Sequence, residues 1–272
     1  MPELPEVETV KNELSPHVIG RRITGIELLW DRIVKETSVS DFLARTKGRK
    51  ILALARHGKY LLWQLDSGDL LVVHLKMTGS LLVGTDGPPK YTRATIHLDD
   101  GHSIYFRDPR KFGVLKLVKD SAEVEDKLGP EPLEPEFTPQ VFAERLKGRK
   151  APIKALLLDQ KFLAGVGNMY ADEALFASKI HPERISGSLT RAESGRLYKA
   201  IRSVLTTAIG CGGASIVTYY RPDGSTGTAH FQFNVAHGQV KNCRVCGTPI
   251  KRIVVRGRGT YFCPKCQGKR KP

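Results

Sequence analysis

The stretch NCRVCGTPIKRIVVRGRGTYFCPKCQ, residues 242–267, decides the fold of the C-terminal end of the chain. Two pairs of cysteines stand in it, with two residues inside each pair and sixteen between the pairs: Cys243, Cys246, Cys263 and Cys266. A tetrahedral Zn²⁺ needs four soft ligands at about 2.3 Å, and a Cys-x2-Cys knuckle supplies two from one tight turn. Four thiolates leave no coordination position for water. The stretch therefore predicts one structural zinc ion, with residues 250–261 forming a hairpin between the pairs.

Cationic side chains crowd this predicted hairpin and its flanks: Lys251, Arg252, Arg256, Arg258, Lys265 and Lys269. A ribbon too small to have an apolar core, held by a metal and rich in Arg, is typical of nucleic-acid binding modules. The pattern predicts binding and leaves open which reaction, if any, follows it.

The whole chain is basic, with 43 Lys and Arg against 28 Asp and Glu in 272 residues, a formal charge of +15. This excess favours a polyanionic partner, most commonly nucleic acid, although a solvated basic surface without a partner is the alternative. The sequence contains no secretory signal and no apolar run long enough to span a membrane. We therefore expect a cytoplasmic protein that contacts no membrane. No feature indicates a partner subunit, so we expect a monomer.

The pattern of apolar residues changes along the chain. A short helix is predicted from about Pro5, with Pro16 ending it. From Arg22 to about Val118, short apolar runs alternate with turn signals, which indicates a sandwich or barrel rather than a parallel sheet. Closely spaced prolines in residues 129–139 predict a linker.

Helical periodicity follows the linker. Thr190 and Glu193 are spaced as a capping box at the start of a long amphipathic helix, which Gly210 ends. We find no internal repeat in the sequence.

The chain opens with Met1-Pro2-Glu3-Leu4. Removal of Met1 would leave Pro2 as a secondary amine, which can attack an electrophilic carbon and form an iminium ion. Glu3 stands beside it as an acid/base group. The alternative interpretation is a simple lead-in to the first helix.

Four other segments contain residues that could carry chemistry or contact nucleic acid, and each has a plain structural interpretation. Lys59 follows a glycine at the start of an apolar strand, where a lysine is commonly solvated. Residues 108–113 read Asp-Pro-Arg-Lys-Phe-Gly, which predicts either a surface loop or a wedge that enters a base stack. Met77 would by itself be assigned to the core. Residues 165–168 read Gly-Val-Gly-Asn, which predicts a turn between helices whose amides could hold a phosphate.

Together these segments resemble the formamidopyrimidine-DNA glycosylase family, which is grouped with endonuclease VIII. The resemblance rests on Pro-Glu-Leu-Pro-Glu at 2–6, His-Gly-Lys-Tyr at 57–60, His-Leu-x-Met-x-Gly at 74–79, Asp-Pro-Arg-Lys-Phe-Gly at 108–113, Gly-Val-Gly-Asn-x-Tyr at 165–170 and the four-cysteine finger. It implies an α+β multidomain protein. The expected parts are a catalytic β-sandwich domain with flanking helices (1–130), a linker (131–139), a helix-two-turn-helix DNA-binding domain (140–235) and a zinc-finger hairpin (236–272).

The resemblance also implies a function: a bifunctional DNA glycosylase and abasic-site lyase of base excision repair. Such an enzyme excises 8-oxoguanine and formamidopyrimidines from double-stranded DNA and also nicks abasic sites by β,δ-elimination. Pro2 would be the Schiff-base nucleophile, with Glu3 assisting base release. Lys59 and Arg258 would serve proton transfer and phosphate binding.

Further residues are implied to contact the DNA or the extruded base. Met77, Arg110 and Phe112 would fill the gap left in the duplex, with Arg110 facing the orphaned cytosine. Other implied DNA contacts are Tyr91, Arg149, Lys154 and Asn168. Those implied for the lesion pocket and its lid are Glu6, Ser215, Thr218, Tyr219 and Tyr220. Tyr91 departs from the histidine of some family members, so its contact is expected to differ in kind.

Two rival functions stay open at this point. An endonuclease VIII-like enzyme acting on oxidised pyrimidines would share the proline–glutamate start and the finger. A non-catalytic protein could keep the fold and only recognise lesions. The leucine at position 4 and the set of Met77, Arg110 and Phe112 favour oxidised purines. The joint presence of Pro2, Glu3, Lys59 and Arg258 favours catalysis.

Overall fold

The computed structural model describes residues 1–216 and 218–268, and its chain divides into two compact units. Unit 1 comprises Met1–Lys127 and Cys211–Thr228, and unit 2 comprises Leu128–Gly210 and the chain from Ala229 onward. Residues 269–272 of the predicted finger domain lie outside the described residues. Each unit has its own secondary structure and is treated by itself below.

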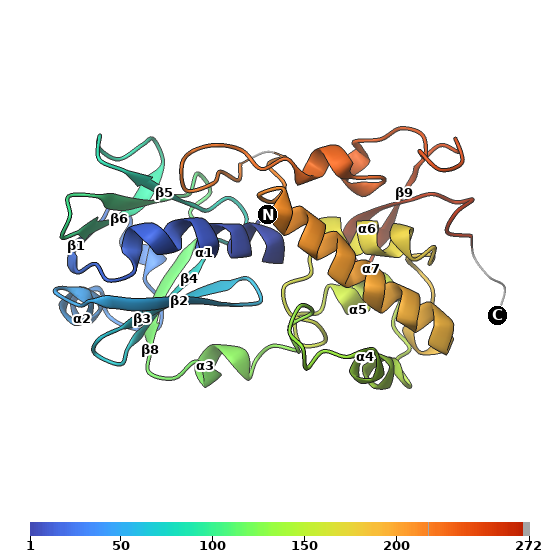
Figure 1. The fold of residues 1–272 in the computed structure, drawn as a ribbon, viewed down its shortest axis with the longest axis horizontal. Coiled ribbons are helices and arrows are strands. Elements are labelled where there is room, and N and C mark those ends of the chain that lie inside the picture. Colours follow the sequence, from blue (N-terminus) through green and yellow to red (C-terminus); the bar gives the residue numbers. More distant parts are fainter. Residues whose placement is uncertain (217, 269–272) are drawn as a thin grey trace. The chain divides into compact units, whose positions relative to one another are not determined.

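Unit 1 is built on two four-stranded antiparallel sheets (Figure 1). One sheet has the order β1 (Ile23–Leu28), β6 (Thr92–Leu98), β7 (Ser103–Arg107) and β5 (Ser80–Gly84). The other has the order β2 (Ile51–His57), β3 (Tyr60–Leu65), β4 (Leu70–His74) and β8 (Val114–Val118). Buried side chains from both sheets, among them Trp63, Leu71, Ile96 and Phe106, form one apolar cluster. The predicted β-sandwich is confirmed.

Helices flank this sandwich: α1 (Leu4–Val18), α2 (Val39–Thr46), α3 (Ala122–Glu125) and the 3-10 turn η1 (Asp31–Ile33). Val7, Val10 and Leu14 of α1 are buried in the same apolar cluster as the strands. The predicted end of the first helix at Pro16 was wrong, because α1 continues to Val18. Proline removes one N–H from the helix, but the completely buried Val18 adds apolar contact with the core that offsets this loss.

Unit 2 is mainly helical, with α4 (Pro139–Leu146), α5 (Ile153–Leu157), α6 (Asn168–Ala177), α7 (Arg191–Gly210) and the 3-10 turns η2 (Ser186–Ser188), η3 (Ala229–Gln232) and η4 (Ala236–Gly238). Its one hairpin in the described residues joins β9 (Lys251–Val255) to β10 (Arg258–Phe262), as the sequence predicts. The predicted capping box is also confirmed. Thr190 N donates to Glu193 Oε2 at 2.8 Å, and Glu193 N donates to Thr190 Oγ1 at 3.2 Å.

Two segments pack differently from their expected domains. The proline-rich stretch expected as a linker belongs to unit 2, where Tyr198 donates to the carbonyl of the buried Phe137 at 2.7 Å. Cys211–Thr228 was expected in the helical domain, but its contacts place it in unit 1. Arg221 explains the second difference, because its Nε donates to the carboxylate of Glu13 on α1 at 2.8 Å.

A short sequence repeat occurs once in each unit, although we expected no internal repeat. FLARTKGRK at 42–50 and FAERLKGRK at 142–150 each end an eight-residue helix, α2 and α4, with the same sequence of buried and exposed positions. Gly48 and Gly148 both adopt positive φ, at 76° and 69°. Arg49 and Arg149 each fold back onto the carbonyl four residues before, at 3.4 Å and 3.3 Å. Only the last turn and its basic tail recur, so a search for longer periods does not find the repeat.

Among the helices of the described residues, none has both the length and the apolar character needed to cross a membrane.

Candidate active site and zinc centre

Pro2 and Glu3 lie immediately before α1, and both residues are buried. The N–H of Glu3 donates to Glu6 Oε2 at 2.7 Å, forming a capping box at the start of the helix. This contact fixes the backbone beside Pro2. The expected nucleophile and its expected acid/base partner thus share one ordered turn.

Glu6 also joins this turn to the segment expected to cover a flipped base. Its carboxylate Oε1 accepts from Ala214 N at 2.8 Å, and its carbonyl accepts from the Tyr219 hydroxyl at 3.3 Å. Burial and the charge of Glu6 raise the pKa of Tyr219 above its usual range, so the phenol stays a neutral donor. A side chain at Gly213, where φ is +77°, would lie 2.9 Å from Glu6 Cγ.

The other expected lid residues lie in the same unit. Ser215 Oγ accepts from Gly227 N at 2.9 Å. Ser80 on β5 connects two more, because its hydroxyl donates to Thr218 O at 3.4 Å and accepts from Tyr220 N at 3.2 Å. The structure therefore brings this segment together with α1 and β5 in unit 1. Val217, between these residues, lies outside the described part of the chain.

Lys59 lies in the turn between β2 and β3, where Gly58 has a φ of +57°. Only 7% of Lys59 is exposed. The solvated lysine that its sequence context allowed is therefore not what the fold produces.

His74 lies next to this lysine and was not singled out from the sequence. It ends β4 opposite Tyr60, whose ring centroid is 4.4 Å away, and its Nδ1 accepts from Lys76 N at 2.9 Å. Burial, together with the charges of Lys76 and Lys59, lowers the pKa of His74 to about 3. The imidazole is therefore neutral, with its proton on Nε2. One sequence signal could have indicated His74. It ends β4, and β4 pairs with β3, the strand that begins directly after Lys59.

The residues expected to fill the duplex lie in two loops of unit 1 that connect neighbouring strands in sequence. Met77 lies between β4 and β5, and Arg110 and Phe112 lie between β7 and β8. Phe112 is 48% exposed, and the Arg110 guanidinium lies 4.7 Å from its ring centroid. The buried carboxylate of Asp108 accepts from Phe112 N at 2.7 Å and also from the hydroxyl of Thr78. The structure thus brings the two connections together, and the core position that was the alternative for Phe112 does not occur.

Tyr91 lies at the base of the same loop. Its carbonyl accepts from Asp108 N at 2.9 Å, and its φ is +73°. Tyr91 is 41% exposed, and Lys90 Nζ and the Arg107 guanidinium carbon lie 5.1 Å and 5.6 Å from its ring centroid. This position therefore offers an aromatic ring flanked by cations, where some family members have a histidine.

Asn168 is the first residue of α6 in unit 2. Its Nδ2 donates to the carbonyl of Gly259 on β10 at 3.1 Å. Its backbone stands at the positive end of a ten-residue helix, after the turn that Gly165 makes with a φ of +83°. This geometry suits a phosphate contact and also fixes the finger.

Lys154 differs from its expected contact with phosphate or lesion, because its side chain is completely buried. Its Nζ lies 2.7 Å from Asp172 Oδ1 and donates to Gly259 O at 3.0 Å and Thr260 Oγ1 at 2.8 Å. Asp172 also accepts from Tyr261 N at 3.1 Å. Burial raises the pKa of Asp172 to about 7, against the opposing effects of Lys154 and Tyr261. The sequence signal for Asp172 was weak, since it is one acidic residue on a helix.

Arg258 opens β10 after a two-residue turn in which Arg256 and Gly257 both have positive φ, 47° and 76°. Such a turn matches the twist of a hairpin. The Arg258 side chain is exposed, and its carbonyl accepts from Thr260 Oγ1 at 2.9 Å. The arginine is therefore displayed at the tip of the hairpin, and Lys154 holds the two residues that follow it, Gly259 and Thr260.

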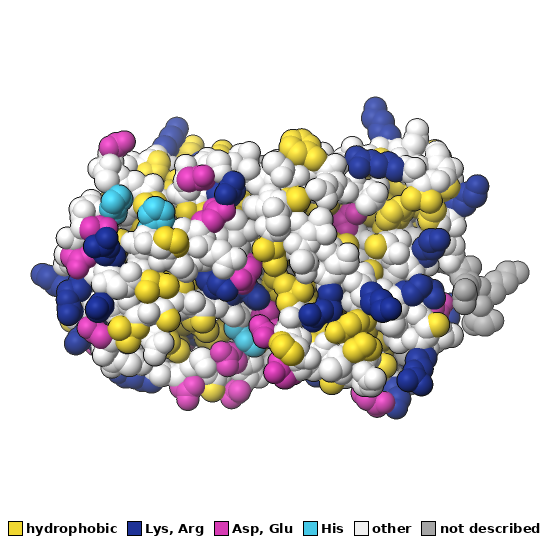
Figure 2. All heavy atoms as spheres, in the orientation of Figure 1, with side chains coloured by type: hydrophobic (Ala, Val, Ile, Leu, Met, Phe, Trp, Pro, Cys, Tyr) yellow, Lys and Arg dark blue, Asp and Glu magenta, His cyan; other side chains and the backbone are white. Residues whose placement is uncertain are grey.

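Arg149 lies in the basic tail of α4, and its side chain is exposed. On the face in Figure 2, Lys and Arg side chains gather over α7, while both signs alternate over unit 1. Four of the cations on α7 are Arg191, Arg196, Lys199 and Arg202. This surface suits a polyanion.

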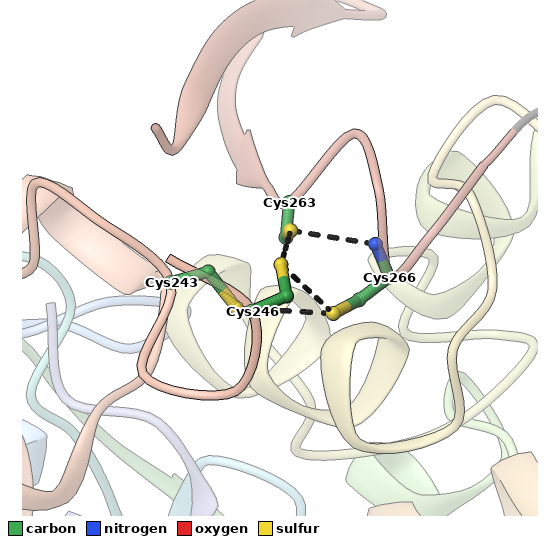
Figure 3. Close-up of side chains that lie close together, drawn as sticks. All are labelled: Cys243, Cys246, Cys263 and Cys266. Atoms are coloured by element: carbon green, nitrogen blue, oxygen red, sulfur yellow. Dashed lines mark hydrogen bonds between the residues drawn. The ribbon is translucent and has the colours of Figure 1, made fainter. Parts of the chain in front are cut away.

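The four cysteines of unit 2 converge on one point, as the spacing predicts (Figure 3). Their sulfurs all lie within 4.8 Å of one another, with separations of 3.8 Å for Cys243–Cys266 and 3.5 Å for Cys246–Cys263. A tetrahedral Zn²⁺ with ligands at about 2.3 Å requires sulfurs about 3.8 Å apart, so the cysteines fit one structural zinc ion. The buried Gln267 connects the second knuckle to the segment after α6 by donating to Ile180 O at 2.9 Å.

The chain matches three domain families in sequence order. Residues 1–115 match the formamidopyrimidine-DNA glycosylase N-terminal domain, and residues 128–220 match the H2TH domain of the same proteins. Residues 241–268 match a zinc finger found in FPG and IleRS. The predicted helix-two-turn-helix domain and zinc finger are confirmed.

Whole proteins of this family are similar over nearly the full chain. A formamidopyrimidine-DNA glycosylase of Symbiobacterium thermophilum is 46% identical over 98% of this chain and 89% of its own length. The crystal structure of the MutM (FPG) protein from Thermus thermophilus is 42% identical, with a TM-score of 0.89, and covers 99% of this chain and 100% of its own. A Lactococcus lactis FPG mutant, solved in complex with a Fapy-dG containing DNA, is 38% identical with a TM-score of 0.91 over 98% of this chain and 100% of its own. The chain belongs to the formamidopyrimidine-DNA glycosylase family.

Proposed function

We propose that this protein excises oxidised purines from double-stranded DNA and cleaves the strand at the resulting abasic site, with the nitrogen of Pro2 as its nucleophile. The observation that carries the proposal is the buried Pro2–Glu3 turn, which Glu6 joins to Ala214 and Tyr219 within unit 1. A nucleophile needs an ordered site from which water is excluded, and this turn provides one. The Lactococcus relatives support the choice of substrate, since they were solved with Fapy-dG and abasic-site DNA.

The chemistry starts once Met1 is removed and Pro2 is an unprotonated secondary amine. Its nitrogen attacks C1′ of the damaged nucleotide, and the bond from C1′ to the base breaks. The base leaves with the bonding electrons and takes up a proton. Opening of the sugar ring then yields an iminium ion between Pro2 and C1′, and Glu3 donates the proton that ring opening requires.

The iminium ion then acts as an electron sink. Loss of a C2′ proton expels the 3′ phosphate, and a second elimination expels the 5′ phosphate. Water finally hydrolyses the imine and regenerates Pro2. In this proposal Lys59 donates a proton and contacts the phosphate beside the lesion, while Arg258 binds phosphate during the second elimination.

A base inside the duplex cannot reach Pro2, so the nucleotide must leave the stack at a cost of about a few kcal/mol. Met77 and Phe112 offset this cost by filling the gap, and Arg110 bonds to the orphaned cytosine. Arg149 and Asn168 bind backbone phosphates, and Tyr91 offers its cation-flanked ring to the same backbone. These contacts explain why the chain carries an excess of Lys and Arg.

The extruded base enters a pocket in unit 1 in our proposal. Glu6 forms its floor together with Ser215, and Thr218, Tyr219 and Tyr220 close over it. The neutral phenol of Tyr219 donates rather than accepts, which keeps Glu6 in place as an acceptor. We also propose that the working enzyme is a monomer, which sedimentation with and without a lesion duplex would test, and that it acts in the cytoplasm.

Borohydride trapping tests the proposal directly. The mature protein should cross-link covalently to an 8-oxoguanine:cytosine duplex, and Pro2→Gly should retain only a small fraction of this product. Trapping confined to oxidised pyrimidines would assign the protein to the endonuclease VIII-like class. No trapping by a protein whose intact mass shows loss of Met1 would leave only lesion recognition.

A further inference from the structure

We propose that the carboxylate of Asp108 is the positioning group that holds the two duplex-filling segments in one arrangement, and thereby controls how efficiently a lesion is extruded. The segments are Met77 with its neighbours and residues 110–112. The inference rests on the proposed function of these residues in filling the duplex. Asp108 itself is completely buried, so it acts through the groups that it holds.

Both oxygens of this carboxylate are used. Oδ1 accepts from Arg110 N at 3.1 Å and from the Thr78 hydroxyl. Oδ2 accepts from Phe112 N and Gly113 N, each at 2.7 Å. Hydrogen bonds to an ionised acceptor are about twice as strong as neutral ones. One charge therefore organises the loop after β7 and also reaches a residue between β4 and β5.

Thr78 is the cross-connection. It follows Met77 directly, is 7% exposed, and lies thirty residues before Asp108 in the sequence. On the other side of Met77, Lys76 has a φ of +53°, and its N–H donates to His74. Met77 is thus held between one residue anchored by a neutral imidazole and another anchored by a buried carboxylate.

The surrounding backbone leaves little freedom for another arrangement. A Cβ at Gly113 would lie 2.4 Å from Phe106 Cζ, and a Cβ at Gly79 would lie 2.5 Å from Leu75 O. Lys111 has a φ of +59°. This conformation costs free energy, and it persists only where neighbouring contacts hold it. The amides of Phe112 and Gly113, which follow it, supply such contacts through Asp108.

The backbone of Asp108 is also fixed. Its N–H donates to Tyr91 O, and its carbonyl accepts from Arg93 Nε at 2.7 Å. The exposed tip of Arg110 and Phe112 therefore stands on a rigid base. Ordering a loop before binding removes an entropic cost from the complex, so this arrangement makes filling the duplex more favourable.

Thr78→Val tests the cross-connection without removing the carboxylate. Valine keeps the shape of threonine and deletes only the hydroxyl, while Thr78→Ser retains it. We expect single-turnover excision from an 8-oxoguanine:cytosine duplex to slow about three- to tenfold in Thr78→Val, and to recover in Thr78→Ser. Asp108→Asn should slow it more, because an amide group would face the N–H groups of Phe112 and Gly113.

Two further measurements separate positioning from general stability. A fluorescent cytosine analogue opposite the lesion should report weaker insertion in Thr78→Val, while borohydride trapping on a single-stranded abasic oligonucleotide should match the wild type. Asp100→Asn is the control, because Asp100 caps another turn of unit 1 by accepting from His102 N at 3.1 Å. Equal loss on both substrates, or wild-type insertion in Thr78→Val, would overturn the inference. If the wild-type protein itself does not trap, the proposed function fails instead.

Discussion

The ammonium of Lys154 lies 2.7 Å from the carboxylate of Asp172, and both side chains are buried inside unit 2. The same ammonium donates to Gly259 and Thr260, the two residues after Arg258. A buried lysine paired in this way does not reach a phosphate. Its effect on DNA must pass through the hairpin that carries Arg258.

Lys154→Met should therefore weaken lesion processing without removing a phosphate contact. Removing one partner of a buried ion pair costs about 3–5 kcal/mol, because Asp172 must then either keep a buried charge without its partner or take up a proton. We expect lower stability and slower strand cleavage, while the slope of log K against log salt for DNA binding by the folded variant stays unchanged. A slope reduced by about 0.9 would show that Lys154 touches a phosphate after all. The double variant Lys154→Met/Asp172→Leu should recover stability, since neither charge is then left alone.

The repeated helix end provides a matched control for Arg149, because Arg49 occupies the equivalent position in unit 1. Arg149→Ala and Arg49→Ala both lose a guanidinium that folds back on the last helical turn, at 3.3 Å and 3.4 Å. Only Arg149 is proposed to bind phosphate. We expect Arg149→Ala to lower the salt slope by about 0.9, with Arg49→Ala close to the wild type. Thermal melting of both variants checks that the shared structural loss is equal, and equal salt slopes would contradict a special role for Arg149.

Much of the fold followed from local sequence patterns, because they depend on a few neighbouring residues. The zinc knuckles, the hairpin between them and the capping box of Thr190 and Glu193 all need only short-range geometry. Pro16 shows the limit of this reasoning. Its local preference to end a helix is outweighed by tertiary burial of Val18, which no local pattern reports.

The site was predictable only where a motif carried it. Lys154 stood in the expected region, but its enclosure depends on Asp172 and on residues more than a hundred positions away. His74 and Asp108 belong to recognised motifs, but the motifs did not indicate a separate role for either residue. Their roles arise from strand pairing and from amides that converge in space, so periodicity and composition could not indicate them.

The zinc centre should be needed for the finger and not for the sandwich. Cys263→Ser should release the metal, because one of four thiolates is lost, and should weaken DNA binding by disordering the hairpin with Arg258. Circular dichroism should still show the strands of unit 1, whose apolar cluster contains none of the four cysteines. Metal analysis by mass spectrometry checks the first outcome. Unchanged zinc content would overturn the assignment of the ligands, and Cys211→Ser serves as the control.

His74 should make stability depend on pH. Burial, with the charges of Lys76 and Lys59, holds the pKa of His74 near 3, against 6.5 for an ordinary histidine. Between these values the unfolded chain binds a proton that the folded protein does not. The contribution of His74 is therefore fully present above about pH 6.5 and is lost as the pH falls toward 3, with a slope of up to about 1.4 kcal/mol per pH unit. Denaturant titrations from pH 7 to pH 5 should show this loss, and His74→Gln should flatten it. An equal slope in His74→Gln would mean that other groups cause the pH dependence and that the imidazole is not held neutral beside Lys59.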